Sequence, residues 1–300
     1  MTVLLDFLPE WTLAMQAAQR SPRTIDNYTA GVRSLARWLE PNAPDVAEPG
    51  DITPSHLRRW LAELSEHGAA PKTVGARYQA VRALFDWLVA EGELTSSPAR
   101  RVERPRLVEP EIRVPTVEEL RAVLATASNR QSFADVRDTA VIRLWLDTGL
   151  RRSELAALRV SDLDVTAGEA GVLGKGRKPR TVAFGSATST ALARYLRLRS
   201  RHPHAGLLEL WLGDRGRGAV DGASLYTMLT RRAARAGVDL HPHQLRHFFA
   251  DAWLKEGGSE GGLMRAAGWS SRQMLDRYAS ANASERSRAE RRRLSLGDGV

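Results

Sequence analysis

The sequence predicts a mainly α-helical protein of two domains, with a small β-hairpin or sheet in the second domain. Three observations favour this fold class. Apolar residues in the first hundred positions recur at intervals of three and four, which is the period of a helix with one buried side. A segment rich in proline and arginine follows at residues 96–115, and a short strand-like stretch lies at residues 171–184. A chain of 300 residues is also long enough for each of two domains to bury its own core.

Residues 1–95 are expected to form a module of four helices, the first of them over about residues 7–18. The second helix has a single apolar stripe, made by Ile25, Tyr28, Val32, Leu35 and Leu39. The third begins at Thr53-Pro54 and closes at Gly68, and the fourth spans residues 74–88 and ends near Gly92.

Residues 96–115 are expected to link the two domains, because four prolines stiffen this segment and block a regular helix. The second domain, residues 116–300, begins with Thr116-Val-Glu-Glu, which has the pattern of a capping box at a helix start. A helix over residues 136–147 is expected to stop at Thr148-Gly149, before the hairpin at 171–184. Helices resume from about Thr188, and the arginine-rich residues 286–293 are expected to be a helix end.

The net charge of +9 suits a polyanionic partner, most often a nucleic acid, with a merely solubilising surface charge as the alternative. The absence of cysteine excludes disulfides and thiolate metal sites. No apolar run has the length of a membrane span, and no basic start of a signal peptide is present. A cytoplasmic protein without a membrane partner is therefore expected.

Basic side chains recur at expected exposed positions of the first domain and in the linker. Those proposed as DNA contacts are Arg23, Arg33, Lys72, Arg77, Arg82, Arg100 and Arg101. Solvated helix faces and an ordinary basic linker remain the alternatives for these residues.

Thr148-Gly-Leu-Arg151-Arg-Ser-Glu154 is the first segment with functional chemistry. Gly149 lets the chain turn between two helices, and Arg151 is expected in the first turn of the second. Glu154, three residues later, would hold the guanidinium in one rotamer, so that it presents a pair of N–H groups to a phosphate. An ordinary surface ion pair is the alternative for this motif taken alone.

Gly174-Lys175-Gly176 lies at the expected hairpin tip, where the flanking glycines let a lysine reach into a neighbouring cleft. The segment is not a phosphate-binding P-loop, because position 169 is Glu and Gly176 stands where Ser or Thr is required. A basic hairpin tip without a catalytic role is the alternative.

His241-Pro-His243-Gln-Leu-Arg246-His247 places a histidine and an arginine three residues apart, on one face of a helix that Pro242 would start. The apolar residues of this segment define the opposite, buried face. A metal site built from its three histidines is the competing interpretation, although carboxylate or thiolate companions are missing from the motif.

Trp269 precedes Tyr278 by nine residues, and Ser270 or Ser271 can cap the helix that contains the tyrosine. A lone tyrosine on a helix is usually a core or surface residue, so this motif decides nothing alone.

In this order and spacing, the four motifs resemble those of the tyrosine recombinase, or phage integrase, family. The resemblance covers nearly the whole chain. The first hundred residues resemble the family's helical core-binding (SAM-like) domain, and residues 116 to about 290 resemble its mixed α/β catalytic domain. The residues before Tyr278 are most similar to those of small integrases of actinobacterial mobile elements.

The resemblance implies an active site formed by Arg151, Lys175, His243, Arg246, Trp269 and Tyr278, with Glu154 and His247 as supporting residues. The two arginines would bind the phosphate and the tyrosine would be the nucleophile. His243 is the candidate base and Lys175 the candidate acid. Trp269 takes a position that more often holds histidine; its indole N–H can donate to a phosphate oxygen but cannot transfer protons. No metal and no cofactor are implied.

The resemblance further implies cutting and rejoining of DNA strands through a 3′-phosphotyrosine intermediate, without ATP. The expected partner is a double-stranded recombination site, bound by a homo-tetramer on two synapsed duplexes in the bacterial cytoplasm, with an accessory directionality factor as a further expected partner. Integration or excision of a mobile element is the first expected role, and Xer-type resolution of chromosome or plasmid dimers is the alternative. A type IB topoisomerase and a non-catalytic DNA-binding regulator on the same fold are the remaining alternatives.

Overall fold

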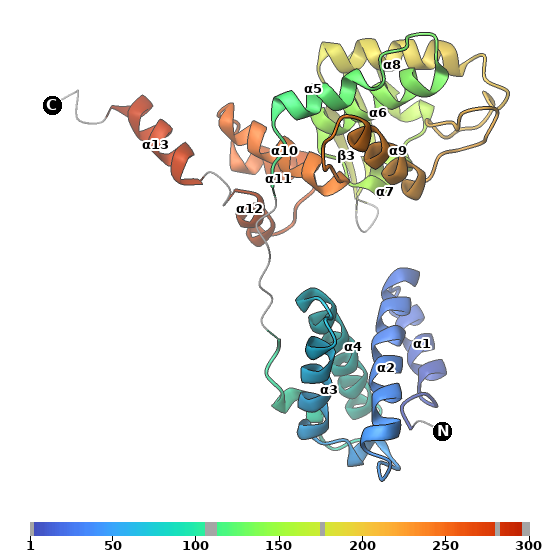
Figure 1. The fold of residues 1–300 in the computed structure, drawn as a ribbon, viewed down its shortest axis with the longest axis vertical. Coiled ribbons are helices and arrows are strands. Elements are labelled where there is room, and N and C mark those ends of the chain that lie inside the picture. Colours follow the sequence, from blue (N-terminus) through green and yellow to red (C-terminus); the bar gives the residue numbers. More distant parts are fainter. Residues whose placement is uncertain (1–2, 106–112, 175–177, 280–282, 296–300) are drawn as a thin grey trace. The chain divides into compact units, whose positions relative to one another are not determined.

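Figure 1 shows the fold in a computed structural model, which describes residues 3–105, 113–174, 178–279 and 283–295. The chain divides into a first unit of residues 1–110 and a second unit of residues 111–300. None of the described helices combines the length and the apolar character that crossing a membrane requires.

The first unit contains the four expected helices. They are α1 (Leu8–Ala17), α2 (Pro22–Asn42), α3 (Pro54–Glu66) and α4 (Pro71–Ala90), with a short 3₁₀ helix, η1 (Pro49–Asp51), before α3. Each of the four begins with a proline in its first turn, where the missing N–H costs no hydrogen bond. The hydroxyls of Ser21 and Thr53 cap α2 and α3 by accepting from the backbone N–H groups of Thr24 and His56, at 3.2 and 3.3 Å.

The centre of the first unit is the contact between α2 and α4. Val32 and Leu35 of α2 are buried there with Leu84 and Phe85 of α4. Gly31 permits the close approach of the two helices, because a Cβ atom at this position would lie 2.5 Å from the Cβ of Ala80. The apolar stripe read from the sequence is therefore the packing face of α2.

The helical unit extends beyond residue 95, where the linker was expected to begin. Pro98–Arg101 form a second 3₁₀ helix, η2, and Ala99 and Val102 are buried in the same core as α2 and α4. The hydroxyl of Tyr78 donates to the carbonyls of Ala99 and Val102, at 3.3 and 2.9 Å. Prolines thus prevent an α-helix here but not a tight turn that packs on the unit. Residues 106–112 of the expected linker lie outside the described residues.

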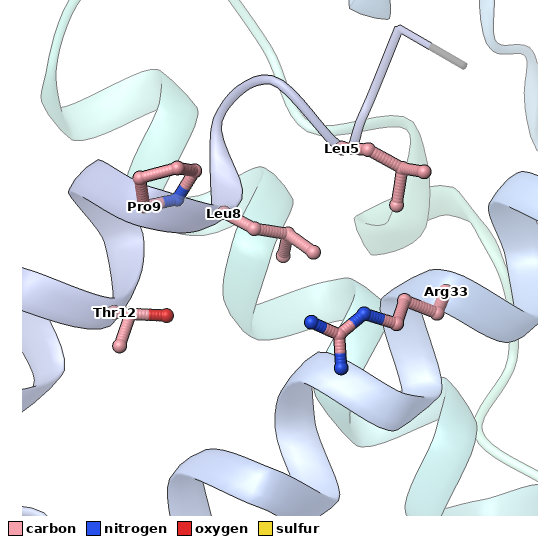
Figure 2. A pocket seen from close by; sticks show the side chains of 5 residues that line it. All are labelled: Leu5, Leu8, Pro9, Thr12 and Arg33. Atoms are coloured by element: carbon pink, nitrogen blue, oxygen red, sulfur yellow. The ribbon is translucent and has the colours of Figure 1, made fainter. Parts of the chain in front are cut away.

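The first unit has a pocket of about 410 Å³. Figure 2 shows the side chains that line it, which are those of Leu5, Leu8, Pro9, Thr12 and Arg33. The guanidinium of Arg33 on α2 points toward the N-terminal segment and α1 in this view. One of the basic residues proposed as a DNA contact therefore lines a partly apolar surface.

The second unit begins with α5 (Val117–Ala125), α6 (Phe133–Thr148) and α7 (Arg152–Ala156). The capping box expected at the start of α5 is present, because Thr116 and Glu119 exchange hydrogen bonds between side chain and backbone N–H. After the 3₁₀ helix η3 (Val160–Asp162), an antiparallel sheet forms in the order β1 (Leu163–Asp164), β2 (Glu169–Leu173) and β3 (Pro179–Ala183). The expected hairpin is thus confirmed as β2 and β3, and a short third strand joins it.

The remaining helices are α8 (Ser186–Arg199), α9 (Gly222–Arg235), α10 (Pro242–Lys255), α11 (Glu260–Ala267), α12 (Arg272–Ala279) and α13 (Ala283–Leu294). Helix α6 lies at the centre of the unit and packs against both α8 and α10. Its residues Val141, Ile142, Leu144 and Trp145 are fully buried in the main core. The arginine-rich tail, expected as a helix end, lies in the separate helix α13.

Candidate active site

The turn between α6 and α7 favours a glycine at position 149 for two reasons. Gly149 has a φ of 56°, in the left-handed region, and caps the C-terminus of α6. A Cβ atom at this position would also lie 2.4 Å from a ring atom of Phe249 on α10. The turn therefore packs closely against α10, the helix that contains His243 and Arg246.

Arg151 lies directly before α7, as its N-cap residue, one position earlier than expected. Its backbone N–H and its Nη1 both donate to the carboxylate of Glu154, each at 2.9 Å. Its Nη2 donates to the carbonyl of Gly268 at 3.2 Å. The expected pair of Arg151 and Glu154 is thus present, and it holds the guanidinium beside the segment that leads to Trp269.

Arg180 on β3 is a member of this cluster that the sequence motifs did not single out. Its Nη1 and Nη2 donate to the two carboxylate oxygens of Glu154, at 3.1 and 2.8 Å, and its Nε donates to the carbonyl of Ala266 at 3.1 Å. A signal was present in the sequence: in the alternating strand β3, position 180 lies on the same face as the buried Val182. A charged residue at such a position requires a buried partner.

Arg246 on α10 is buried, with an exposed fraction of 3%. Its Nη1 donates to the carbonyl of Gly149 at 2.6 Å, and its Nη2 donates to the carbonyl of Ala267 at 2.5 Å. Its guanidinium carbon lies 5.3 Å from the ring centroid of Trp269, within the range of a cation–π contact. This side chain thus bridges the α6–α7 turn and the C-terminus of α11.

The three arginines bind consecutive carbonyl groups at the end of α11. The backbone N–H groups of Gly268 and Trp269 already use the carbonyls of Arg265 and Met264. The next three carbonyls, of Ala266, Ala267 and Gly268, accept from Arg180, Arg246 and Arg151 respectively. The negative end of a helix dipole attracts such cations, so this arrangement is electrostatically favourable.

Trp269 anchors the segment that follows α11. It is buried in a small apolar cluster with Phe249 of α10, Leu263 of α11 and Leu275 of α12. Helix α12 also packs against α10. Because Tyr278 lies one helical turn after Leu275, the backbone of α12 is held close to the elements that contain the arginines.

His243 and His247 differ in exposure, although both lie on α10. His243, in the first turn, is exposed, whereas His247 is buried. The exposed histidine is accessible to a bound substrate, and the buried one is suited to a supporting role. His241, the third histidine of the motif, stacks on Tyr226 with a centroid distance of 5.9 Å. Among the described residues, no three His, Asp or Glu side chains gather as a metal-ligand group.

Two candidates lie wholly or partly outside the described residues. Lys175 falls within the undescribed residues 175–177, at the connection between β2 and β3. Tyr278 is described only in its backbone, within α12. The structure therefore brings together Arg151, Glu154, Arg246 and Trp269, and it places the chain on both sides of Lys175.

The pKa of the Glu154 carboxyl lies below its ordinary value. Burial acts to raise this pKa, since the side chain is only 5% exposed, but the hydrogen bonds from Arg180 and from Arg151 outweigh burial. Glu154 is therefore held as a carboxylate between two guanidinium groups.

Replacing Glu154 by glutamine is expected to make the second unit less sensitive to acid. Because the folded pKa is depressed, the carboxylate contributes stability that is present above its unfolded pKa of about 4.3 and is lost as the pH falls through the folded pKa. The unfolding temperature of the wild type should therefore fall more steeply below about pH 5 than that of the variant. Thermal unfolding followed by circular dichroism measures both slopes. Glu118→Gln, at a side chain that is 78% exposed, is the control and should keep the wild-type slope. Equal slopes for Glu154→Gln and the wild type would contradict this account of Glu154.

The comparisons with known proteins agree with the motifs. The model of the "Phage integrase family" matches residues 113–285, and that of the "Phage integrase, N-terminal SAM-like domain" matches residues 10–92. The chain is 34% identical over 237 residues to "Tyrosine recombinase XerC" of Chromohalobacter salexigens, covering 78% of each chain. It is 30% identical over 262 residues to the XerC of Xanthomonas axonopodis pv. citri, covering 84% of each.

A solved structure shares the fold. It is the "Crystal structure of a lambda integrase tetramer bound to a Holliday junction", with a TM-score of 0.69 and 16% identity, covering 89% of this chain and 77% of that one. The family model alone spans more than half of the chain, and the arginines, glycines and tryptophan of its motifs are assembled around one helix end. The chain therefore belongs to the phage integrase family.

Proposed function

We propose that the chain is a site-specific DNA recombinase that cuts and rejoins strands through a covalent link between Tyr278 and a DNA 3′-phosphate. The observation that supports this most is the attachment of Arg151 and Arg246 to the residues that lead into α12, which contains Tyr278. Two phosphate-binding cations are thereby tied to the same short segment as the nucleophile.

The proposed cleavage step is a transfer of the phosphoryl group from a DNA oxygen to tyrosine. The Tyr278 oxygen bonds to phosphorus, and the bond from phosphorus to the 5′-oxygen breaks. His243 accepts the phenol proton, and Lys175 donates a proton to the leaving 5′-oxygen. Phenol has a pKa of about 10, so the tyrosine needs such a base or a strongly cationic surrounding near neutral pH.

Arg151 and Arg246 act on the charge that develops at phosphorus. The five-coordinate transition state has more negative charge on its oxygens than the diester, and guanidinium donors stabilise it. Arg151 is fixed by the Gly268 carbonyl and by Glu154 while its side chain stays 31% exposed, so little reorganisation of this donor is needed when the phosphate arrives. The indole N–H of Trp269 is a further donor to a phosphate oxygen.

Rejoining is the reverse of cleavage. The phosphotyrosine bond retains the energy of the broken diester, so a 5′-hydroxyl from another strand can attack it and release Tyr278. Strand exchange therefore needs neither ATP nor a metal cofactor in this scheme. We propose a homo-tetramer on two duplexes as the active assembly, with an accessory factor setting direction. The lambda integrase structure, a tetramer bound to a Holliday junction, supports an assembly of four subunits.

The basic residues of the first unit are proposed to contact the DNA backbone. Arg23, Arg33 and Lys72 are exposed, and Arg77 is half-buried on α4. Asp86 lies between Arg82 and Arg100, at 3.7 and 2.9 Å, and this carboxylate offsets part of their charge. We therefore rank Arg82 and Arg100 below Arg23, Arg33, Lys72 and Arg101 as phosphate contacts.

Two biological roles are consistent with this chemistry. Integration or excision of a mobile element is favoured by the residues that precede Tyr278, which are similar to those of actinobacterial element integrases. Resolution of chromosome or plasmid dimers is favoured by the XerC relatives.

Sequencing the genomic DNA that becomes covalently attached to the protein distinguishes between these two roles. Wild-type protein is incubated with fragmented DNA from its source, denatured with detergent, and purified with any attached strand for sequencing. The proposed function predicts attached DNA at one or a few sites, and none with Tyr278→Phe. Sites at the borders of a mobile element support integration, and a single site in the chromosome or a plasmid outside any mobile element supports dimer resolution. DNA binding without attached strands contradicts catalysis and supports a regulator.

A further inference from the structure

Arg180 lies beside the residues that support three proposed catalytic groups, Arg151, Lys175 and Trp269. It binds both oxygens of Glu154, which in turn holds Arg151. A Cβ atom at Gly174, the residue before Lys175, would lie 3.0 Å from its Nη1. A Cβ atom at Gly268, the residue before Trp269, would lie 3.1 Å from its guanidinium carbon. The Arg180 guanidinium is therefore packed between β2, α7 and the end of α11.

The glycines at 174 and 268 allow this close packing. Gly174 donates its N–H to the carbonyl of Lys178 at 2.9 Å, which closes the hairpin beside Arg180. Gly268 adopts a left-handed φ of 64° and ends α11. Helix α11 packs against β3, and the two lie side by side in Figure 1. The side chain of Arg180, only 12% exposed, fills the space between them.

The charge balance of the cluster depends on Arg180. Glu154 is 5% exposed and carries one negative charge between two guanidinium groups, so the trio has a net charge of +1. Without Arg180, the Glu154 carboxylate would be paired with Arg151 alone. An ion pair of that kind has no net charge, and Arg151, whose side chain is 31% exposed, would offer much less attraction to a phosphate.

We infer that Arg180 is a positioning residue for strand cleavage, which acts through Glu154 on Arg151 and through Ala266 on the segment leading to Trp269. Arg180 does not touch the phosphate in this assignment. It neutralises the carboxylate that orients Arg151, and so leaves the charge of Arg151 for the substrate. The inference rests on the proposed function, because it concerns the same cleavage step.

The test is the rate of covalent adduct formation on a nicked DNA duplex that contains the captured site and traps the cleaved strand. Arg180→Met is expected to slow adduct formation on the order of 10²-fold, the size of effect that misplacement of a reacting group produces. DNA affinity should stay within about threefold, because the one phosphate contact of Arg151 supplies only a small part of an affinity that comes from many phosphate contacts. Adding Glu154→Gln to Arg180→Met should recover roughly tenfold of the rate, since removing the carboxylate returns the net charge of Arg151.

This recovery distinguishes positioning from a purely structural role. If Arg180 only supported the fold, loss of Glu154 would remove further hydrogen bonds and slow the reaction more. Arg121→Met is the matched control, because Arg121 on α5 is 75% exposed and its loss removes the same charge from the same unit. It should react as the wild type does. A wild-type rate for Arg180→Met, or a double variant no faster than Arg180→Met, overturns the inference.

Arg180→Lys is a milder substitution for the case in which Arg180→Met does not fold, and its rate of adduct formation and its DNA affinity are compared with those of the wild type. An ammonium keeps the charge but cannot span both Glu154 oxygens and the Ala266 carbonyl together. This variant should cleave more slowly than the wild type at unchanged DNA affinity, and equal cleavage overturns the inference. Absence of an adduct with the wild-type protein contradicts the proposed function instead, so the two failures are distinguishable.

Discussion

Tyr278→Phe is expected to abolish the covalent protein–DNA adduct while DNA binding is retained. Phenylalanine has the same ring but lacks the oxygen that must bond to phosphorus, so no other step can replace the missing nucleophile. The measurement is denaturing gel electrophoresis after incubation with the nicked duplex, whose trapped strand prevents rejoining. Gel-shift titration of the same protein samples reports binding.

Tyr226→Phe is the matched control for this experiment. Tyr226 lies on α9 of the same unit and is 38% exposed, so the substitution removes a hydroxyl of the same type outside the cluster. It should form the adduct at the wild-type rate. Adduct formation by Tyr278→Phe would mean that another residue is the nucleophile.

Arg246→Ala is expected to lower the rate of adduct formation by about 10³-fold or more, the effect of losing an arginine that stabilises a phosphoryl transition state. The buried guanidinium holds both the α6–α7 turn and the end of α11, so its loss removes the donor and loosens the segment before Trp269. The change should be larger than that of Arg180→Met, because Arg246 is proposed to contact the phosphate.

The charge of the scissile phosphate provides the diagnostic measurement for Arg246. A methylphosphonate at this position lacks the negative charge that the arginine neutralises, so the wild type and Arg246→Ala should differ much less on it. Arg246→Lys, which keeps one cation, should fall between them on the ordinary diester. If Arg246→Ala slows adduct formation equally on the diester and the methylphosphonate, Arg246 supports the fold and does not act on the phosphate charge. If the rate on the diester is unchanged, Arg246 is not part of the active site.

Local features of the structure were predictable from the sequence. The four helices of the first unit follow from apolar spacing and from prolines in their first turns, and Gly149 follows from the turn it must form. The Arg151–Glu154 pair follows from the three-residue spacing, which brings the residue before a helix together with the third residue of its first turn. These interactions depend on neighbours in the sequence.

Features that join distant segments were not predictable. Arg180 donates hydrogen bonds to Glu154, 26 positions away in the sequence, and to Ala266, 86 positions away. No local sequence pattern predicts either contact. The same holds for Asp138 of α6, which is fully buried between Arg137 and Arg232 of α9, 94 positions away. The motif also placed Arg246 and His243 together on an outward face, whereas Arg246 is buried against carbonyls and His243 is exposed. Tertiary packing decides these positions.

The most direct test of the account is to identify the residue to which the DNA strand becomes attached. The wild-type adduct from the nicked duplex is digested with protease and nuclease, and mass spectrometry locates the remaining nucleotide. We predict one modified peptide, from α12, with a 3′-nucleotide on the oxygen of Tyr278. A nucleotide on any other residue, or one linked through its 5′-phosphate, would contradict it.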